Sequence, residues 1–426
     1  MRIASQLVPD EKIPKFVKIG QKLDRKYLTE KQIISGIRDG IRSQALLEKV
    51  CPGMVVCITA GSRGISNIAL ITKTLVEAVR EKGAEPVIIP AMGSHGGATA
   101  EGQEAVLESY GITKESMGCR IHASMETKQI GVAEGIPVYI DSFAASCDGI
   151  IAVNRIKAHT AFRGEFESGL MKMLAVGLGK QKGAAACHAS GFAYMAARIS
   201  LLGKEIIRNA PILMGIAVIE NAYDQTYKIE VLRPEDIVIR EPGLLEEAKS
   251  VMGRIYFEKC DILIVRQIGK NFSGDGMDPN VTGRFSTEFA SGGLNAGRVG
   301  ILDLAAASQG SAVGMGKADI ASRRLFEKID FDATYANFVT TCNPYDYKMP
   351  IILDSDRKVI QALISSCYGV DKDALKMIII NNSQDLGVIL VSQALLAECH
   401  HRDKIEVLSE PFDLEFDEQQ SLLTVF

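Results

Sequence analysis

The chain has 426 residues, of which 47% are hydrophobic and 23% are charged, and its formal net charge is −4. This length exceeds one ordinary core and predicts two or three domains of about 100–200 residues; the composition excludes a disordered or fibrous chain. The lack of a long basic run argues against nucleic acid as a partner. The longest apolar stretches, such as 210–219, reach only about half of the roughly twenty residues that a membrane-spanning helix needs, so we expect no membrane segment.

The cysteines indicate the expected compartment. The chain has nine cysteines, an odd number, and no CxxC pair. Its first residues include Asp10, Glu11 and Lys12 rather than an apolar leader. Because disulfides belong to oxidising compartments, this pattern predicts reduced thiols in a cytoplasmic protein.

The first 150 residues alternate short apolar runs with amphipathic segments. Predicted strands lie at 54–59, 86–90, 137–141 and 148–154, and predicted helices lie at 66–82 and 100–110. The first of these helices places Ile68, Ile71 and Leu75 on one face at helical spacing. Strand, glycine turn, helix and strand in this order are typical of a parallel α/β sheet.

A second alternation begins near residue 245. Predicted helices lie at 244–257, 316–328, 356–367 and 388–398, and predicted strands at 261–266 and 376–380. Glu241-Pro242-Gly243 indicates a domain boundary. We therefore predict an α/β fold of two α/β domains with mostly parallel sheets. The domains would cover 1–245 and 246–405, followed by an acidic segment, 406–426, that could form an edge strand.

Two glycine-rich turns, 61–67 and 93–99, follow predicted strands and open predicted helices. The ligand crevice of a parallel sheet lies at the carboxyl ends of its strands, where helix N-termini attract anions. We expect both turns to face one ligand that bears phosphate or carboxylate; the alternative is two tight turns with ordinary helix caps. Arg63 and His95 in these turns favour a ligand. Neither turn is GxGxxG, so the dinucleotide-binding fingerprint is absent. The stretch 177–181 lacks the Ser or Thr of a P-loop, which argues against an NTPase.

The segment 157–191 holds His159, Lys172 and His188 at separations of 13 and 16 residues. No pair has the i, i+4 spacing of a zinc helix. A metal bound by one histidine of this chain would therefore need most of its ligands from a cofactor.

A charged, glycine-rich loop spans 267–284. Its charged residues are Lys270, Asp275, Asp278 and Arg284. A long charged loop near a domain junction favours a functional role over a solvated surface loop.

The ordered set of Arg63, Gly93-Ser94-His95, His159, Lys172 and His188 resembles the nickel-pincer-nucleotide lactate racemase family, over nearly the whole chain. The spacing of 16 residues from Lys172 to His188 agrees with that family. The stretch 276–284, GMDPNVTGR, resembles a branch of pincer-cofactor isomerases outside the strict lactate racemases. The resemblance implies a cofactor-binding, catalytic N-terminal domain, and a C-terminal domain that closes an interdomain active-site cleft.

The resemblance also implies roles for individual residues. The cofactor would be a pyridinium-3,5-bisthiocarboxylate mononucleotide that carries nickel. His188 would be its protein metal ligand, and Lys172 its covalent attachment point. His95 and His159 would be the acid/base pair, and Arg63 would hold the substrate carboxylate. Further cofactor contacts are expected from Gly61, Ser62, Ser94, Lys270 and Arg284.

The implied reaction is racemisation or epimerisation of a 2-hydroxy acid by reversible hydride transfer. Two histidines suit it, because each enantiomer needs its own base and a histidine titrates near neutral pH. The implied partners are the small-molecule substrate and the enzymes that make the cofactor, and the oligomeric state is left open. Alternatives are a dehydratase that uses Asp275 or Asp278, a transhydrogenase, and a non-catalytic cofactor carrier.

The sequence departs from the family pattern at three positions. Ala60 stands where the family has an acidic residue, and Gly283 and Ser286 stand where it has Gln and Lys. These differences favour a larger or more anionic 2-hydroxy acid than lactate.

Overall fold

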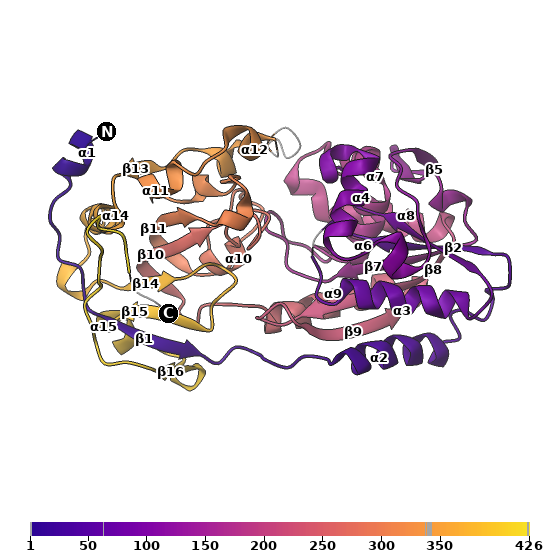
Figure 1. The fold of residues 1–426 in the computed structure, drawn as a ribbon, viewed down its shortest axis with the longest axis horizontal. Coiled ribbons are helices and arrows are strands. Elements are labelled where there is room, and N and C mark those ends of the chain that lie inside the picture. The colour runs from indigo at the N-terminus through magenta and orange to yellow at the C-terminus, as the bar shows by residue number, and fades with distance from the viewer. Residues whose placement is uncertain (1, 63, 337, 339–342, 424–425) are drawn as a thin grey trace. The chain divides into compact units, whose positions relative to one another are not determined.

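The computed structural model describes residues 2–62, 64–336, 338, 343–423 and 426. The chain divides into two compact units: Arg25–Met252 forms one, and Met1–Asp24 together with Gly253–Phe426 forms the other. We call them the inner unit and the outer unit, after their order in the chain. Figure 1 shows the indigo strand β1 of the N-terminal segment beside the yellow strands of the C-terminal segment.

The inner unit is built on one six-stranded sheet in the order β4-β3-β2-β7-β8-β9, in which all neighbours are parallel except β8 and β9. Its strands are β2 Val55–Ala60, β3 Glu85–Pro90, β4 Arg120–Ile121, β7 Gly149–Arg155, β8 Ile212–Glu220 and β9 Thr226–Leu232. A separate antiparallel hairpin joins β5 Thr127–Ala133 to β6 Ile136–Asp141.

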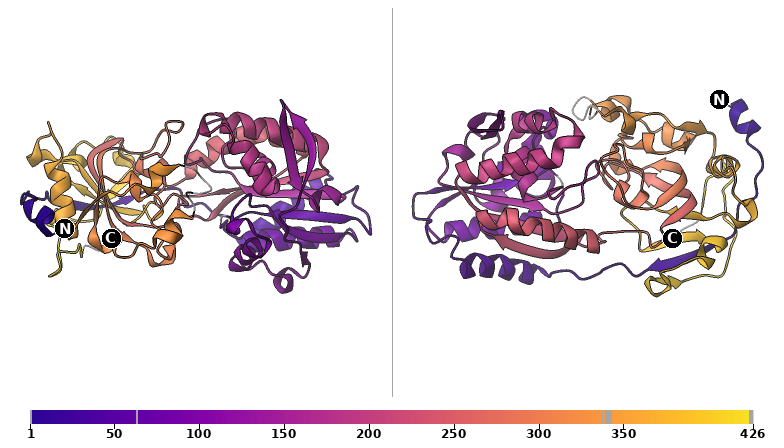
Figure 2. Two further views of the ribbon diagram at one scale, coloured as in Figure 1. Left: turned by 90° about the horizontal axis from the view of Figure 1, so that it is seen from above. Right: turned by 180° about the vertical axis from the view of Figure 1, so that it is seen from behind.

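Helices cover both faces of this sheet (Figure 2). They are α2 Glu30–Ser43, α3 Ile68–Arg80, α4 Ala100–Ser109, α5 Lys114–Met117, α6 Leu170–Lys172, α7 Lys180–His188, α8 Met195–Asn209 and α9 Pro234–Val251. Because successive side chains of a strand point to opposite faces of the sheet, β7 contributes to two hydrophobic cores. Ile151 and Val153 pack with α2 and α3, whereas Ile150 and Ala152 pack with α6, α8 and α9.

The outer unit has an eight-stranded sheet in the order β13-β12-β11-β10-β14-β15-β1-β16. The strands from β13 to β14 are parallel, and β15, β1 and β16 are added antiparallel. Its strands are β1 Phe16–Gln21, β10 Lys259–Ile268, β11 Asn295–Leu304, β12 Ile320–Ser322, β13 Ile351–Leu353, β14 Met377–Ile380, β15 Val388–Ser392 and β16 Ile405–Val407. Its helices are α1 Arg2–Leu7, α10 Pro279–Thr282, α11 Arg323–Phe326, α12 Phe331–Tyr335, α14 Asp356–Ser365 and α15 Gln393–Ala397.

The predicted α/β class with two units and mostly parallel sheets is confirmed. The division differs from 1–245 and 246–405, because β1 pairs with β15 and β16 and so places residues 1–24 in the outer unit. The boundary expected at Glu241-Pro242-Gly243 falls inside α9. Within 406–426, strand β16 ends at Val407, and the described residues that follow it pair only through isolated bridges.

Three predicted elements were wrong, and two share a cause. Residues 388–398 were expected to be one helix, but β15 ends at Ser392, whose side chain accepts a hydrogen bond from the Leu395 amide and so starts α15. Residues 316–328 divide in the same way, with Ser322 between β12 and α11. The third is the helix expected at 244–257, which begins ten residues earlier, at Pro234. None of the helices in the described part of the chain is both long and apolar enough to cross a membrane.

Candidate active site

Three neighbouring parallel strands of the inner unit, β3, β2 and β7, end at one edge of the sheet. Ser62 follows β2, His95 follows β3 and His159 follows β7. The chain leaves β2 toward β3 and leaves β7 toward β8, on opposite sides, so β2 and β7 flank the topological switch point of the sheet. In open α/β sheets this is the place where ligands bind.

The two glycine-rich turns meet in the structure. The Ser62 hydroxyl and His95 Nδ1 are in hydrogen-bond contact. Tyr110 donates to the Ser62 carbonyl over 2.7 Å. The buried Gln103 amide donates to the carbonyls of Gly93, at 3.1 Å, and His95, at 3.2 Å. These bonds fix the backbone on either side of His95 while the residue itself stays exposed.

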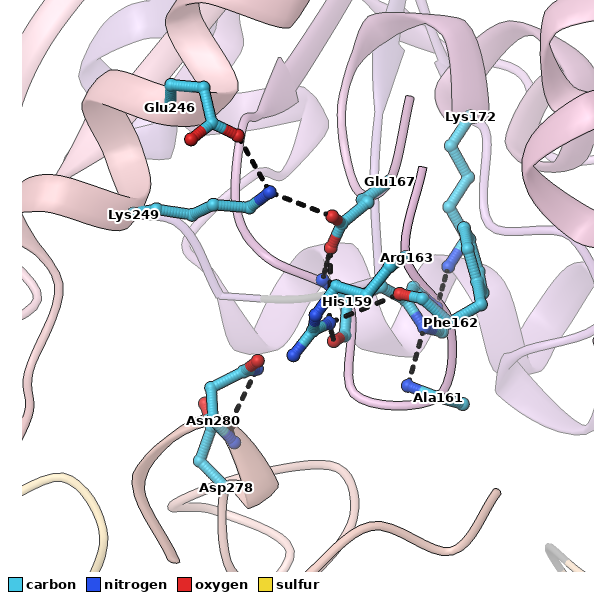
Figure 3. A network of polar contacts seen from close by, with 10 residues as sticks. All are labelled: His159, Ala161, Phe162, Arg163, Glu167, Lys172, Glu246, Lys249, Asp278 and Asn280. Atoms are coloured by element: carbon cyan, nitrogen blue, oxygen red, sulfur yellow. Dashed lines mark hydrogen bonds and ion pairs between the residues drawn. The ribbon is translucent and has the colours of Figure 1, made fainter. Parts of the chain in front are cut away.

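His159 lies on a loop that the bridge between Lys157 and Ser168 closes. Its Nε2 is 2.6 Å from Lys172 Nζ, and its Nδ1 accepts the Ala161 amide over 3.0 Å. Its ring stacks on Phe162 with centroids 4.1 Å apart. Figure 3 shows His159 between Ala161 and Lys172. The structure thus places two of the predicted site residues in direct contact.

A buried carboxylate organises this loop. Glu167, whose side chain is fully buried, accepts the His159 amide over 2.7 Å. The same carboxylate lies 3.3 Å from Arg163 and 3.0 Å from Lys249 of α9 (Figure 3). A buried carboxylate is tolerated only when cations and donors surround it, so Glu167 ties the histidine loop to α9.

Lys172 and His188 lie at opposite ends of one helical run, in which a π-helix, Met173–Leu178, links α6 to α7. A straight helix of 16 residues would separate its ends by about 24 Å. The run instead breaks after the π-helix, where Lys180 adopts φ +53°. A Cβ on Gly93 would lie 3.3 Å from Val176 and 3.5 Å from Ala184, so the segments on both sides of the break face the same turn.

The side chain of Lys180 anchors this break. It is fully buried, and its Nζ lies 3.1 Å from an Asp141 oxygen and 3.4 Å from the Gln103 amide oxygen. It also donates to the Pro90 carbonyl at the end of β3. Burial lowers the pKa of Lys180 more than the Asp141 carboxylate raises it. A non-glycine residue at positive φ persists only where its surroundings hold it.

His188 has the tautomer of a metal ligand. Its Nδ1 donates to the Ala184 carbonyl over 2.7 Å, which leaves the Nε2 lone pair for a ligand. Its residue keeps exposed surface, yet desolvation by neighbouring atoms lowers its pKa and favours the neutral imidazole that metals need. The adjacent Cys187 is fully buried, and burial raises its pKa to about 12, so it remains a thiol.

Among the described residues, no group of three or more His, Cys, Asp or Glu side chains could hold a metal ion. A metal at His188 would therefore take its other ligands from a cofactor. The ring of Phe192 meets the His188 ring edge-on, with the ring centroids 6.2 Å apart.

The remaining predicted residues have different settings. A Cβ on Gly61 would lie 3.2 Å from the end of the Met173 side chain, next to Lys172, so a larger residue there would require that side chain to shift. Ser94 is half-buried in the second turn. Arg63 lies outside the described residues.

Lys270 and Arg284 belong to the outer unit. The Lys270 amide donates to the Ser308 hydroxyl over 3.0 Å. Arg284 pairs with Asp319 at 3.0 Å and donates to the Ala296 carbonyl.

The two aspartates of the same loop have structural partners. Asp278 caps α10 by accepting the Asn280 amide over 2.9 Å. Asp275 lies 3.4 Å from the buried Lys317. The cap and the ion pair each hold the loop in place.

Residues 4–199 match the family model of the lactate racemase N-terminal domain. This part of the chain is thus similar to the N-terminal domain of lactate racemases. The matched segment of the lactate racemase N-terminal domain contains His95, His159, Lys172 and His188, whereas Lys270 and Arg284 lie beyond it.

The fold of the whole chain is also similar to a solved structure, that of the lactate racemase apoprotein from Thermoanaerobacterium thermosaccharolyticum. The similarity has a TM-score of 0.51 and covers 87% of this chain and 99% of that chain, at 13% identity. At this identity it shows the fold alone. No curated protein matches the sequence.

Proposed function

We propose that this chain is a racemase or epimerase of a 2-hydroxy acid and works with a nickel-pincer nucleotide. The observation that carries the proposal is the convergence of His95 and the His159–Lys172 pair at the carboxyl ends of β3 and β7, within the matched domain. A non-catalytic carrier of the cofactor would have no need for two histidines at this edge.

The described residues fit the cofactor. The Nε2 lone pair of His188 suits a metal that favours imidazole, and the Lys172 amine suits attachment to a thioacyl arm. When bound, the cofactor would supply the site that accepts and returns a hydride. Its supply would make the enzymes of cofactor synthesis partners of this chain.

The chain itself would position the substrate and move its hydroxyl proton. His95 and His159 would face the two enantiomers, each able to take or give the proton near neutral pH. Ser62 would orient the His95 ring through Nδ1. Arg63 would hold the substrate carboxylate, since a guanidinium binds a carboxylate with two parallel hydrogen bonds.

The substrate class is proposed from the departures in sequence. Ala60, at the end of β2, is buried and uncharged where the family pattern has an acid. Loss of a negative charge beside the substrate arginine would favour a more anionic acid than lactate. A dehydratase is less well supported, because Asp275 and Asp278 are used in an ion pair and a helix cap.

The test is to co-express the chain with the cofactor-synthesis enzymes. Nickel content, intact mass and turnover of a panel of chiral 2-hydroxy acids are then measured. We expect one nickel per chain, a mass increase that maps to Lys172, and racemisation of at least one acid. His188→Ala should lose nickel, and His95→Ala should lose about 10²–10⁴-fold in rate.

His400→Ala is the matched control, because His400 is an exposed histidine in the other unit. It should keep both nickel and rate. Full nickel content in His188→Ala would overturn the metal assignment. Fully loaded protein that racemises no acid in the panel would overturn the proposed reaction.

A further inference from the structure

The contact between His159 and Lys172 constrains where the protons of both side chains lie. Their nitrogens are 2.6 Å apart, so one hydrogen atom lies between them. Either lysine donates to an unprotonated Nε2, or a protonated Nε2 donates to the lysine nitrogen. The other ring nitrogen of His159 decides between these two cases.

The Ala161 contact fixes the tautomer of His159. A backbone N–H can only donate, and the Ala161 amide points at His159 Nδ1 over 3.0 Å. Nδ1 must therefore carry a lone pair, and the proton of the neutral ring sits on Nε2. A flipped ring would place carbon atoms at both contacts and lose both hydrogen bonds.

The proton on Nε2 then sets the state of Lys172. An ammonium has three donors and no acceptor, so a protonated Nε2 facing it would bring two donors together at 2.6 Å. An uncharged amine has a lone pair that accepts the Nε2 proton. A cation–π contact would add little in favour of the charged form, because Lys172 Nζ lies 5.9 Å from the Phe162 ring centre, at the outer limit of such a contact.

We infer that, in the cofactor-free chain, His159 keeps its proton on Nε2 and donates it to an uncharged Lys172 amine. His159 thus holds Lys172 in the only form of a lysine that is nucleophilic. This gives His159 a task before turnover that His95 does not share. The Ser62 hydroxyl at His95 Nδ1 can donate or accept, so it leaves both tautomers of His95 open.

The meaning of this pairing for cofactor attachment rests on the proposed function, but the protonation states can be measured without the cofactor. The first measurement is long-range ¹H–¹⁵N NMR of the full chain labelled in its histidines, with His159→Gln to assign the signals. We expect His159 Nδ1 to be unprotonated and Nε2 to be protonated at pH 7. A protonated Nδ1 would overturn the inference.

The second measurement is amine labelling of the cofactor-free chain by an acylating reagent, followed by mass spectrometry. An ordinary lysine with a pKa of about 10.4 is uncharged in only about one molecule in 2,500 at pH 7. For each lysine, the rate at pH 7 is divided by the rate at pH 10, which removes differences in accessibility. We expect this ratio to be at least about ten-fold higher for Lys172 than for Lys182, an exposed lysine of α7.

Two variants separate this role from a merely structural one. His159→Gln keeps an N–H donor for Lys172 and an oxygen acceptor for Ala161, so the high labelling ratio of Lys172 should be retained. His159→Phe keeps a ring on Phe162 but removes the donor, so the ratio should fall to that of Lys182. Equal ratios for Lys172 and Lys182 in the wild type would overturn the inference. Failure to racemise hydroxy acids, with the NMR and labelling results as expected, would overturn only the proposed function.

Discussion

Among the described residues, each unit buries one lysine side chain completely, yet the two lysines differ in charge balance. Lys180 of the inner unit faces one carboxylate, Asp141, at 3.1 Å. Lys317 of the outer unit faces two, Asp346 at 3.1 Å and Asp275 at 3.4 Å. Burial acts to lower both pKa values; one carboxylate leaves the pKa of Lys180 lowered, whereas two raise the pKa of Lys317.

The difference shows which of the two buried lysines is in an energetically unfavourable setting. Lys317 links its own segment to those of Asp275 and Asp346. The two carboxylates compensate its charge, as a structural ion cluster requires. Lys180 combines a positive φ with an incompletely compensated charge, and it does so at the break between Lys172 and His188. Uncompensated burial and backbone strain concentrate at functional sites, so the comparison supports the proposal that the active site lies in the inner unit.

The largest effect on stability is expected from Lys317→Met. It leaves Asp275 and Asp346 close together without their cation, so the free energy of unfolding of the outer unit should fall by about 3–5 kcal/mol. Denaturant titration measures this change. Lys328→Met is the matched control, because Lys328 is half-exposed in its pair with Asp303 and should cost less than about 1 kcal/mol. Similar losses in the two variants would contradict the assignment.

Lys180→Met should follow, at about 2–4 kcal/mol, because it strands one buried carboxylate instead of two. Its distinctive result is local: hydrogen exchange should rise in 179–188, where the helical run loses its anchor. The double variant Lys180→Met, Asp141→Asn removes the stranded charge and should recover part of the stability without restoring protection at 179–188. Unchanged exchange in the single variant would show that the break needs no anchor.

The pH dependence of the two lysines should have opposite signs. Because the pKa of Lys317 is raised, this lysine stabilises the folded state fully below the unfolded pKa of about 10.4. That stabilisation is lost as pH rises through the folded pKa. The stability difference between wild type and Lys317→Met should therefore shrink at high pH. Because the pKa of Lys180 is lowered in the folded state, the unfolded state binds more protons at this lysine below about pH 10.4. The stability of the wild type relative to Lys180→Met should therefore increase as pH rises toward that value. Unfolding titrations from pH 8 to 11 test both signs, and a shared direction would contradict the comparison.

The smallest effect is expected from Gln103→Leu, which cuts the link between Lys180 and the second turn. The carbonyls of Gly93 and His95 lose a donor, at a cost of about 1–3 kcal/mol. The His95 ring should become more mobile, which its NMR line widths report, while the Nε2 proton of His159 stays in place. A change at His159 of equal size would show that the two histidines are coupled through a different route.

Much of the sheet could be predicted from the sequence, because β2, β3 and β10 are short apolar runs between turn residues, a local signal. The meeting of the two turns followed from the parallel order of their strands. Strand β1 could not be predicted in place, since its partners β15 and β16 lie at the far end of the chain.

The site residues also divide into those that the sequence indicated and those that it did not. His95, His159, Lys172 and His188, the residues proposed to carry the chemistry, stand out by type and order. Glu167, Gln103 and Lys180 were missed, because a charged or amide side chain becomes a buried anchor only through partners distant in sequence. Lys180 was noticed only as part of a failed P-loop; the two glycines that precede it, Gly177 and Gly179, were the one local signal of a break.

The position of β1 has a consequence for synthesis on the ribosome. Phe16–Gln21 is made early, but it lies between β15 and β16, which are made last. At about 5–20 residues per second, β1 waits roughly 20–80 s for its neighbours. During that time Arg25–Met252 has its whole sheet available, so the inner unit can fold first, while the outer unit can close only when the last strands emerge. An apolar strand that stays unpaired for so long is a natural target for a chaperone.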